Sequence, residues 1–291
     1  MSTTTLSSQR TSRLELSIKH YCRYRAGLAR SRAVKFLDRF LDPQATRFYS
    51  LLVANGHPQL SYIDVLPQQK ILYLAIPKCG STTIRTALAA MIGEIPRCCE
   101  HVHLRRQSIL KSPKQVGAST FYRLVKDESA LRFSFVRNPY DRLVSAWADK
   151  FQNKPLVPGD DIVGAYLRKQ QAMNLALPKN ADQTLSFADF VHFVGATADN
   201  PTDMHWRPQD DLLNLPGVSF DFIGRLETFS RDFARVIEHA RADQSLAAAA
   251  DAHLNKSQRR DWRDYYTSAL AHQVYRIYER DFDRLAYPRA V

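Results

Sequence analysis

The sequence predicts an α/β fold: a P-loop-like central parallel β-sheet flanked by helices, in a single domain that follows a basic helical extension. Two stretches carry this prediction, residues 71–85 and residues 131–147, because each passes from an apolar strand through a short polar loop into a helix. Residues 71–76 contain no charge and no turn former, as expected for a strand buried on both faces. We place the extension at residues 1–65 and the domain at residues 66–291.

The composition is that of a globular protein with an excess of positive charge. The 291 residues are 45% hydrophobic and 24% charged, which is ordinary for a chain that buries a full core. The net charge of +12 indicates an acidic partner: a polyanionic ligand, nucleic acid or an anionic membrane surface. The four cysteines do not form a disulfide framework, which fits a reducing cytosol. No run reaches the roughly 20 apolar residues of a membrane span.

The extension is the most basic part of the chain. Residues 1–41 contain nine Lys and Arg but only two acidic residues. Their apolar positions are unevenly spaced and Gly27 interrupts them, so we favour a helix packed on the domain over one that lies on an anionic membrane. Residues 42–69 read as a connecting segment.

The loop after the first strand has the composition of an anion-binding site. After Pro77 it reads KCGSTT, residues 78–83. A strand, a tight loop and a helix together direct backbone N–H groups and the positive helix end at a phosphate. Gly80 allows a close approach of the backbone, and Lys78 adds a charge. The nucleotide-triphosphate loop has its lysine after a second glycine, whereas here the lysine precedes the only glycine; an ordinary turn is the alternative.

The second stretch leads from the strand at residues 131–136 into another helix. Asn138 is a favourable N-cap and Pro139 suits the first helical position. Arg137 stands at the end of the strand, and Ser145 follows it by eight residues, two turns into the helix. Taken alone, these two residues also fit a charged strand end and an ordinary helix serine.

Together the stretches resemble the donor-binding motifs of sulfotransferases that use 3′-phosphoadenosine 5′-phosphosulfate (PAPS). PKCGSTT resembles their 5′-phosphosulfate loop, and RNPYDRLVSAW at residues 137–147 resembles their 3′-phosphate motif. Weaker similarities to the carbohydrate-sulfotransferase branch lie downstream, at residues 204–213 (MHWRPQDDLL), 220–229 (FDFIGRLETF), 253–267 (an Asn-x-Ser basic segment) and 274–287 (a closing helix). The resemblance implies the sulfotransferase fold.

The resemblance also implies how PAPS binds. Lys78 would stabilise charge on the leaving group, and the backbone N–H groups of residues 79–83 would bind the 5′-phosphate. Arg137 and Ser145 would select the 3′-phosphate, which distinguishes PAPS from ATP. The full implied donor-binding set is Lys78, Cys79, Gly80, Ser81, Thr82, Thr83, Arg137, Ser145, Asn255 and Ser257.

The catalytic base is sought between the two motifs. His101 and His103 would share one side of an extended segment, and histidine titrates near neutral pH. Some members of the resembled branch have their catalytic histidine in such an HxH segment, which implies His103 as the base, with His101 second. Glu100 is a third candidate, and His205, in the HWRP segment beyond the second motif, is the next to test. Two polar loop histidines are the alternative. The spacing of Cys98 and Cys99 from these histidines does not match zinc sites, and we expect no metal.

Two other functions remain as alternatives. A nucleotide-triphosphate kinase or hydrolase would need Mg²⁺ and a carboxylate at a strand end, and a nucleic-acid-binding protein would need a basic and aromatic platform. We find neither feature and expect no nucleic-acid partner. The expected acceptor is a carbohydrate or glycolipid hydroxyl. Golgi members of the resembled branch carry an N-terminal anchor that has no counterpart here, so we expect a cytoplasmic enzyme with at most a peripheral contact to an anionic membrane.

Overall fold

A four-stranded mixed sheet is the centre of the described structure. The computed structural model describes residues 42–94, 108–152, 171–172, 184–198, 203–246 and 260–290. Within these residues the strands lie in the order β1-β2-β3-β4, and they are β1 (Ile63–Leu66), β2 (Ile71–Leu74), β3 (Leu131–Val136) and β4 (Phe222–Arg225). The last three are parallel, whereas β1 pairs antiparallel with β2. The predicted α/β fold is confirmed, with an antiparallel edge strand added to the parallel part.

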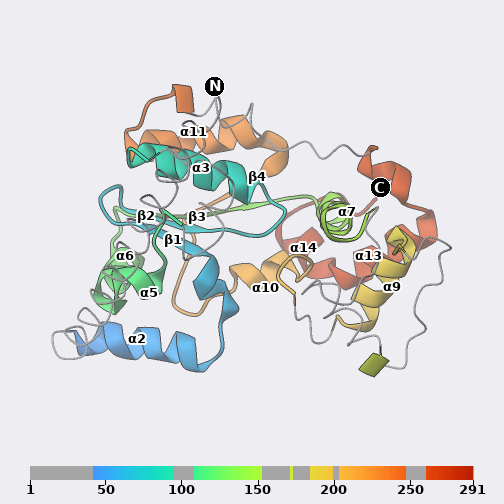
Figure 1. The fold of residues 1–291 in the computed structure, drawn as a ribbon, viewed down its shortest axis with the longest axis horizontal. Coiled ribbons are helices and arrows are strands. Elements are labelled where there is room, and N and C mark those ends of the chain that lie inside the picture. The colour runs from blue at the N-terminus through green and yellow to red at the C-terminus, as the bar shows by residue number, and fades with distance from the viewer. Residues whose placement is uncertain are drawn as a thin grey trace, which may run out of the picture.

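Helices cover both faces of this sheet (Figure 1). On one face lie α3 (Ser81–Met91) and α11 (Phe229–Ala240), and on the other lie α2 (Pro43–Ala54), α5 (Pro113–Val116) and α6 (Ala118–Lys126). Short 3-10 helices occupy Pro58–Tyr62, Leu226–Thr228 and Trp262–Tyr265.

The side chains of β2 alternate between the two faces, as the pleat of a strand requires. Ile71 and Tyr73 join the buried cluster of α3 and α11, while Leu72 and Leu74 join the cluster of α2 and α6. Every one of these four side chains is buried. The absence of charged residues from this strand is therefore explained by burial on both sides.

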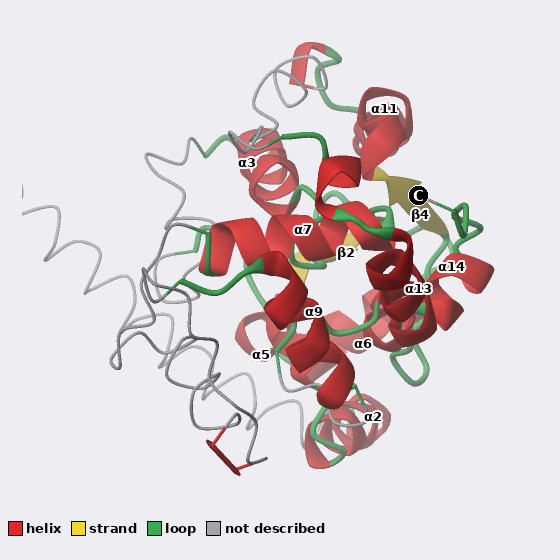
Figure 2. Ribbon diagram, turned by 90° about the vertical axis from the view of Figure 1, so that its right-hand side faces the viewer, coloured by secondary structure: helices red, strands yellow, loops and turns green. Residues whose placement is uncertain are grey.

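A second group of helices lies beyond the sheet, where α7 follows β3 directly. The group contains α7 (Pro139–Lys150), α9 (Phe187–Ala196), α10 (Gln209–Leu213), α13 (Ser268–Ile277) and α14 (Glu279–Arg284). Figure 2 shows α7, α9, α13 and α14 in front of the strands. The predicted closing helix is thus divided into α13 and α14, with Tyr278 between them.

The chain joins the sheet earlier than the sequence predicts. The boundary predicted after residue 65 falls inside β1, and α2 packs on α6 through the rings of Phe48 and Phe121, whose centroids are 6.1 Å apart. Residues 42–66 thus belong to the domain, although the sequence reads as a connecting segment. Residues 1–41 lie outside the described part, so both placements of the basic helix stay predictions. Among the described helices, none has the length and apolar character to cross a membrane.

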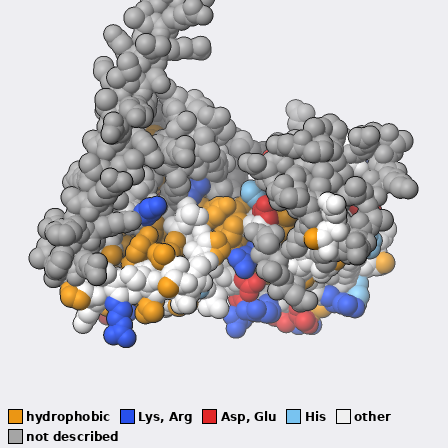
Figure 3. Space-filling view, turned by 60° about the horizontal axis from the view of Figure 1, so that its bottom comes forward, with side chains coloured by type: hydrophobic (Ala, Val, Ile, Leu, Met, Phe, Trp, Pro, Cys, Tyr) orange, Lys and Arg blue, Asp and Glu red, His pale blue; other side chains and the backbone are white. Residues whose placement is uncertain are grey.

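Basic and acidic side chains are mixed on the described part of the face in Figure 3. Ion pairs between α14 and α10 are an example of such mixing. Arg284 lies 2.9 Å from Asp210, and Arg280 lies 3.2 Å from Asp211 and also pairs with Asp210. The charge of these arginines is therefore balanced locally.

Candidate active site

The loop between β2 and α3 turns at two residues with left-handed backbone conformations. Lys78 has φ 69° and Gly80 has φ 75°. Glycine adopts this conformation without strain, whereas it is uncommon for lysine. Gly80 is the N-cap of α3, and Ser81 is the first helical residue. The positive end of the helix dipole therefore lies in the loop, as the strand–loop–helix prediction requires.

The amino group of Lys78 is paired with a carboxylate of α7. Its Nζ lies 3.2 Å from Oδ2 of Asp149, and Lys150 approaches the same oxygen at 3.0 Å. Burial lowers the pKa of Lys78, and the ion pair with Asp149 only partly opposes this. Burial would also raise the pKa of Asp149, but the two lysines hold it at about 2. Asp149 is consequently ionised at neutral pH beside the loop.

Arg137 connects the second motif to the loop. Its Nη1 donates to the backbone carbonyl of Lys78 at 3.2 Å, and its Nε donates to Oδ2 of Asp141 at 2.7 Å. The side chain of Asn138 accepts a hydrogen bond from the backbone N–H of Tyr140, so the predicted N-cap of α7 is confirmed. The same helix carries Ser145, which is 9% exposed. The two motifs are therefore in direct contact in the folded chain.

Arg142 fixes a third segment against the loop. It is 2% exposed, and all three of its described hydrogen bonds go to backbone carbonyls. Nε donates to Pro77 at 3.1 Å, while Nη1 and Nη2 donate to Arg207 at 2.7 Å and to Met204 at 2.9 Å. The segment that contains His205 is thereby held next to the phosphosulfate-like loop.

Comparison with known proteins identifies the family. A profile described as "Sulfotransferase family" matches residues 61–288. The chain belongs to the sulfotransferase family. It is similar to carbohydrate sulfotransferase 12 of Mus musculus, with 25% identity over 266 aligned residues; this match covers 79% of this chain and 61% of the relative. It is also similar to carbohydrate sulfotransferase 11 of Mus musculus, with 25% identity over 240 aligned residues; this match covers 77% of this chain and 66% of the relative.

A further relative is carbohydrate sulfotransferase 10 of Xenopus laevis, which is 25% identical over 248 aligned residues; this match covers 78% of this chain and 68% of the relative. The predicted resemblance to the carbohydrate-sulfotransferase branch is confirmed by these matches. The chain spans 61% and 66% of the length of the two Mus musculus relatives. No solved structure matches this chain.

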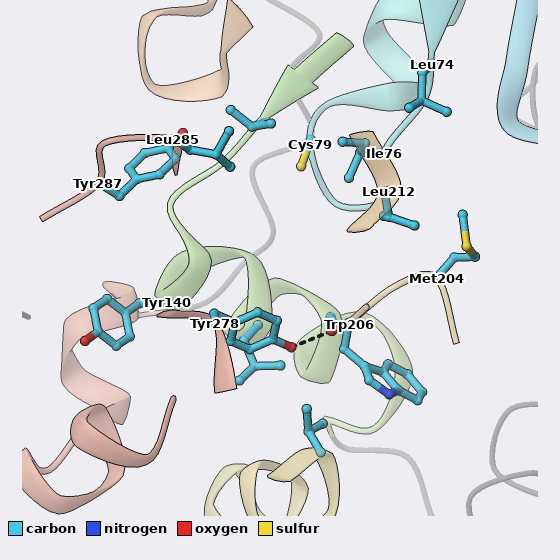
Figure 4. Close-up of a cluster of buried hydrophobic side chains, with 14 of the residues drawn as sticks. Leu74, Ile76, Cys79, Tyr140, Met204, Trp206, Leu212, Tyr278, Leu285 and Tyr287 are labelled. Carbon is cyan, nitrogen blue, oxygen red and sulfur yellow. Dashed lines mark hydrogen bonds between the residues drawn. The ribbon is translucent and has the colours of Figure 1, made fainter. Parts of the chain in front are cut away.

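The side chain of Cys79 lies on the buried side of the loop. It lies beside Ile76 in a cluster of buried hydrophobic side chains (Figure 4). Sγ donates to Oε1 of Gln209 at 3.3 Å, and the backbone N–H donates to the carbonyl of Ile76 at 3.3 Å. Burial raises the pKa of the thiol to about 12. The side chain of Cys79 therefore supports the loop from inside, and the donor contact implied for its backbone N–H stays a prediction.

The other loop residues divide by exposure. Ser81 and Thr82 are partly exposed in the first turn of α3, and Thr83 is buried. Ser81 and Thr82 are thus accessible to a ligand at the helix end. Of the remaining predicted site residues, Glu100, His101, His103, Asn255 and Ser257 lie outside the described residues, and their roles stay predictions.

His205 is the one histidine among the four predicted base candidates that the structure describes. Its Nδ1 lies 2.6 Å from Oδ1 of Asp203, and its backbone N–H donates to the same oxygen at 2.7 Å. Burial would raise the pKa of Asp203, but the contacts with His205 lower it below its ordinary value. This carboxylate fixes the ring so that Nε2 points away from Asp203.

Glu227 joins the end of β4 to the start of α7. Oε1 accepts a hydrogen bond from the backbone N–H of Asn138 at 2.6 Å, and Oε2 accepts from the hydroxyl of Tyr287 at 3.0 Å. The sequence resemblance at residues 220–229 covers Glu227 but does not predict these contacts. The sequence also does not predict the contacts of three further residues, Arg142, Asp149 and Gln209, because each has a partner far away in the sequence. Among the described residues, no group of three or more His, Cys, Asp or Glu could hold a metal ion.

Proposed function

We propose that this sulfotransferase moves the sulfuryl group of PAPS to a hydroxyl of a carbohydrate or glycolipid. One observation carries the proposal: the guanidinium of Arg137 donates a hydrogen bond to the carbonyl of Lys78, so the two stretches that resemble the donor-binding motifs are in direct contact. The names of its relatives support a carbohydrate acceptor. A cytoplasmic location stays a prediction.

The residues of the site fit the anionic groups of PAPS. The positive end of α3 and the partly exposed Ser81 and Thr82 suit the 5′-phosphate. Arg137 supplies a planar cation for the 3′-phosphate, and Ser145 lies two turns along α7. AMP and ATP have no 3′-phosphate, so contacts to that group would select the donor.

The chemistry requires an activated acceptor and a stabilised leaving group. PAPS supplies an already activated sulfuryl group. Lys78 would stabilise the negative charge that grows on the bridging oxygen, and a histidine would remove the proton of the acceptor hydroxyl. We keep the order implied by the sequence, with His103 first, His101 second, Glu100 third and His205 next.

A thermal-shift titration tests the donor. Adenosine 3′,5′-bisphosphate should raise the melting temperature clearly, since a ligand at a hundredfold excess over its Kd adds about 2.7 kcal/mol to folding stability. AMP, ATP and a DNA duplex at the same concentration should raise it much less. Equal shifts from AMP and the bisphosphate would contradict the assignment of Arg137 and Ser145. A screen of glycans with a radiolabelled sulfate donor then identifies the acceptor.

A further inference from the structure

One buried amide lies between the two donor motifs. Gln209 is 0% exposed, and its side chain makes hydrogen bonds with both. Oε1 accepts from the backbone N–H of Arg137 at 2.9 Å and from Sγ of Cys79 at 3.3 Å. Nε2 donates to the carbonyl of Arg137 at 2.8 Å. The amide thus bonds to both backbone groups of Arg137 at the end of β3, as a neighbouring strand would.

Asp281 fixes the orientation of this amide from the opposite side. This carboxylate of α14 is also 0% exposed, and its Oδ2 accepts from the backbone N–H of Gln209 at 2.9 Å and from Nε2 at 3.3 Å. Its Oδ1 accepts from the backbone N–H of Asp210 at 2.8 Å. Because the backbone N–H of Arg137 needs an acceptor and its carbonyl needs a donor, Oε1 lies on the side of that N–H and of Cys79, and Nε2 lies on the side of the carbonyl and of Asp281.

The amide determines where Arg137 stands relative to the loop. Its contacts hold the backbone of Arg137, while the guanidinium is held at its far end by the carbonyl of Lys78 and by Asp141. We propose that Gln209 is a positioning residue of the donor site. It sets the spacing between the phosphosulfate loop and Arg137, and through Arg137 it sets the selectivity for a 3′-phosphate. This inference rests on the proposed function.

An isosteric substitution and an apolar one both test the role of the amide. Gln209→Glu keeps an oxygen toward Cys79 but removes the Nε2 donor and places a second carboxyl beside Asp281. Gln209→Met keeps the length of the side chain and removes all of its amide hydrogen bonds. For both variants we expect the affinity ratio between adenosine 3′,5′-bisphosphate and AMP to fall about tenfold, as one lost hydrogen bond to a charged or tightly held group would produce.

A buried glutamine elsewhere in the domain is the matched control. Gln59 is 5% exposed, and its Nε2 donates to the carbonyl of Asp211 at 3.1 Å. Gln59→Met should lower the melting temperature yet leave the affinity ratio within about threefold of the wild type. If the Gln209 variants also keep the wild-type ratio, Gln209 has only a structural role and the proposal is overturned.

A double-mutant cycle shows whether Gln209 acts through Arg137. In an Arg137→Ala background, Gln209→Met should change the affinity for the bisphosphate by less than about threefold, because the group that Gln209 positions is gone. Full additivity of the two substitutions would overturn the proposal. A wild-type chain without preference for the bisphosphate would instead overturn the donor assignment, and with it this role of Gln209.

Discussion

The guanidinium of Arg137 donates a hydrogen bond to the backbone carbonyl of Lys78, a residue 59 positions earlier in the chain. Lys78 holds an uncommon left-handed conformation at this point, with φ 69°. The bond therefore does two things: it satisfies a carbonyl in a strained turn, and it fixes the distance between two cationic side chains. A ligand with phosphates at both ends would find both cations already in place.

Replacing Arg137 with alanine should mainly weaken donor binding. The arginine would contact the 3′-phosphate equally in the ground and transition states, so the loss falls on affinity rather than on turnover. We expect adenosine 3′,5′-bisphosphate to bind more weakly by about 1.5–3 kcal/mol, measured by calorimetry. Arg123→Ala, at an exposed position on α6, is the control and should bind normally. Normal affinity in the Arg137 variant would remove it from the donor site.

Replacing Lys78 with alanine should lower turnover as well as affinity. Charge on the bridging oxygen grows as the S–O bond breaks, so a cation there is worth more in the transition state. Single-turnover sulfate transfer at saturating donor measures the effect. Lys70→Ala is a close control, because Lys70 also has positive φ, stands at the other end of β2 and lies 3.1 Å from an aspartate. A Lys78 variant with only a binding defect would contradict this role.

The pH dependence of stability should reveal the ion pair of Lys78 with Asp149. The pKa of Asp149 is lowered from 3.8 to about 2 in the folded chain. Its contribution is therefore complete above pH 4 and is lost as the pH falls through about 2. Asp149→Asn should show a shallower loss of stability in this window. The difference should be on the order of 1 kcal/mol or less, because the exposed side chain is screened by solvent.

Urea unfolding at several pH values from 2 to 6 measures this difference. Lys78→Met is the matching control, since removal of the lysine should also flatten the pH dependence. If Asp149→Asn follows the wild-type curve throughout, the two side chains are not paired in solution.

Local sequence signals predicted the strands and helices on which the two motifs lie. β3 was predicted with its observed bounds, since Leu131–Val136 is followed by a recognisable N-cap at Asn138 and by Pro139. β2 was predicted two residues too long, because the apolar residues continue past its last ladder partner, Leu74. In each case the information lies within a few consecutive residues.

Signals that depend on distant partners were missed. β1 contains Asp64, which is buried and would be unfavourable in a strand without Arg85, whose Nε donates to it at 2.7 Å. Gln209 and Asp281 are 72 positions apart, and neither residue type indicates a buried contact by itself. Such pairs become visible only when the fold brings both partners together.

The last prediction concerns which residue is the general base for the acceptor hydroxyl. His103→Ala should leave the affinity for the bisphosphate nearly unchanged, because a base for the acceptor hydroxyl need not contact the nucleotide. The single-turnover rate should fall by roughly 10²–10⁴-fold, the usual range for a lost general base. His101→Ala and Glu100→Gln should lose less, and His192→Ala, at an exposed position on α9, should lose nothing.

His205 and Asp203 supply the competing outcome. If the base is His205, then His205→Ala should have the large defect in the single-turnover rate. Asp203→Asn should have a smaller defect, because a neutral amide stabilises the imidazolium formed during proton transfer less than a carboxylate does. A near-normal rate in His103→Ala together with these two defects would transfer the role to His205. A collapse in His103→Ala with near-normal rates in His205→Ala and Asp203→Asn would confirm His103.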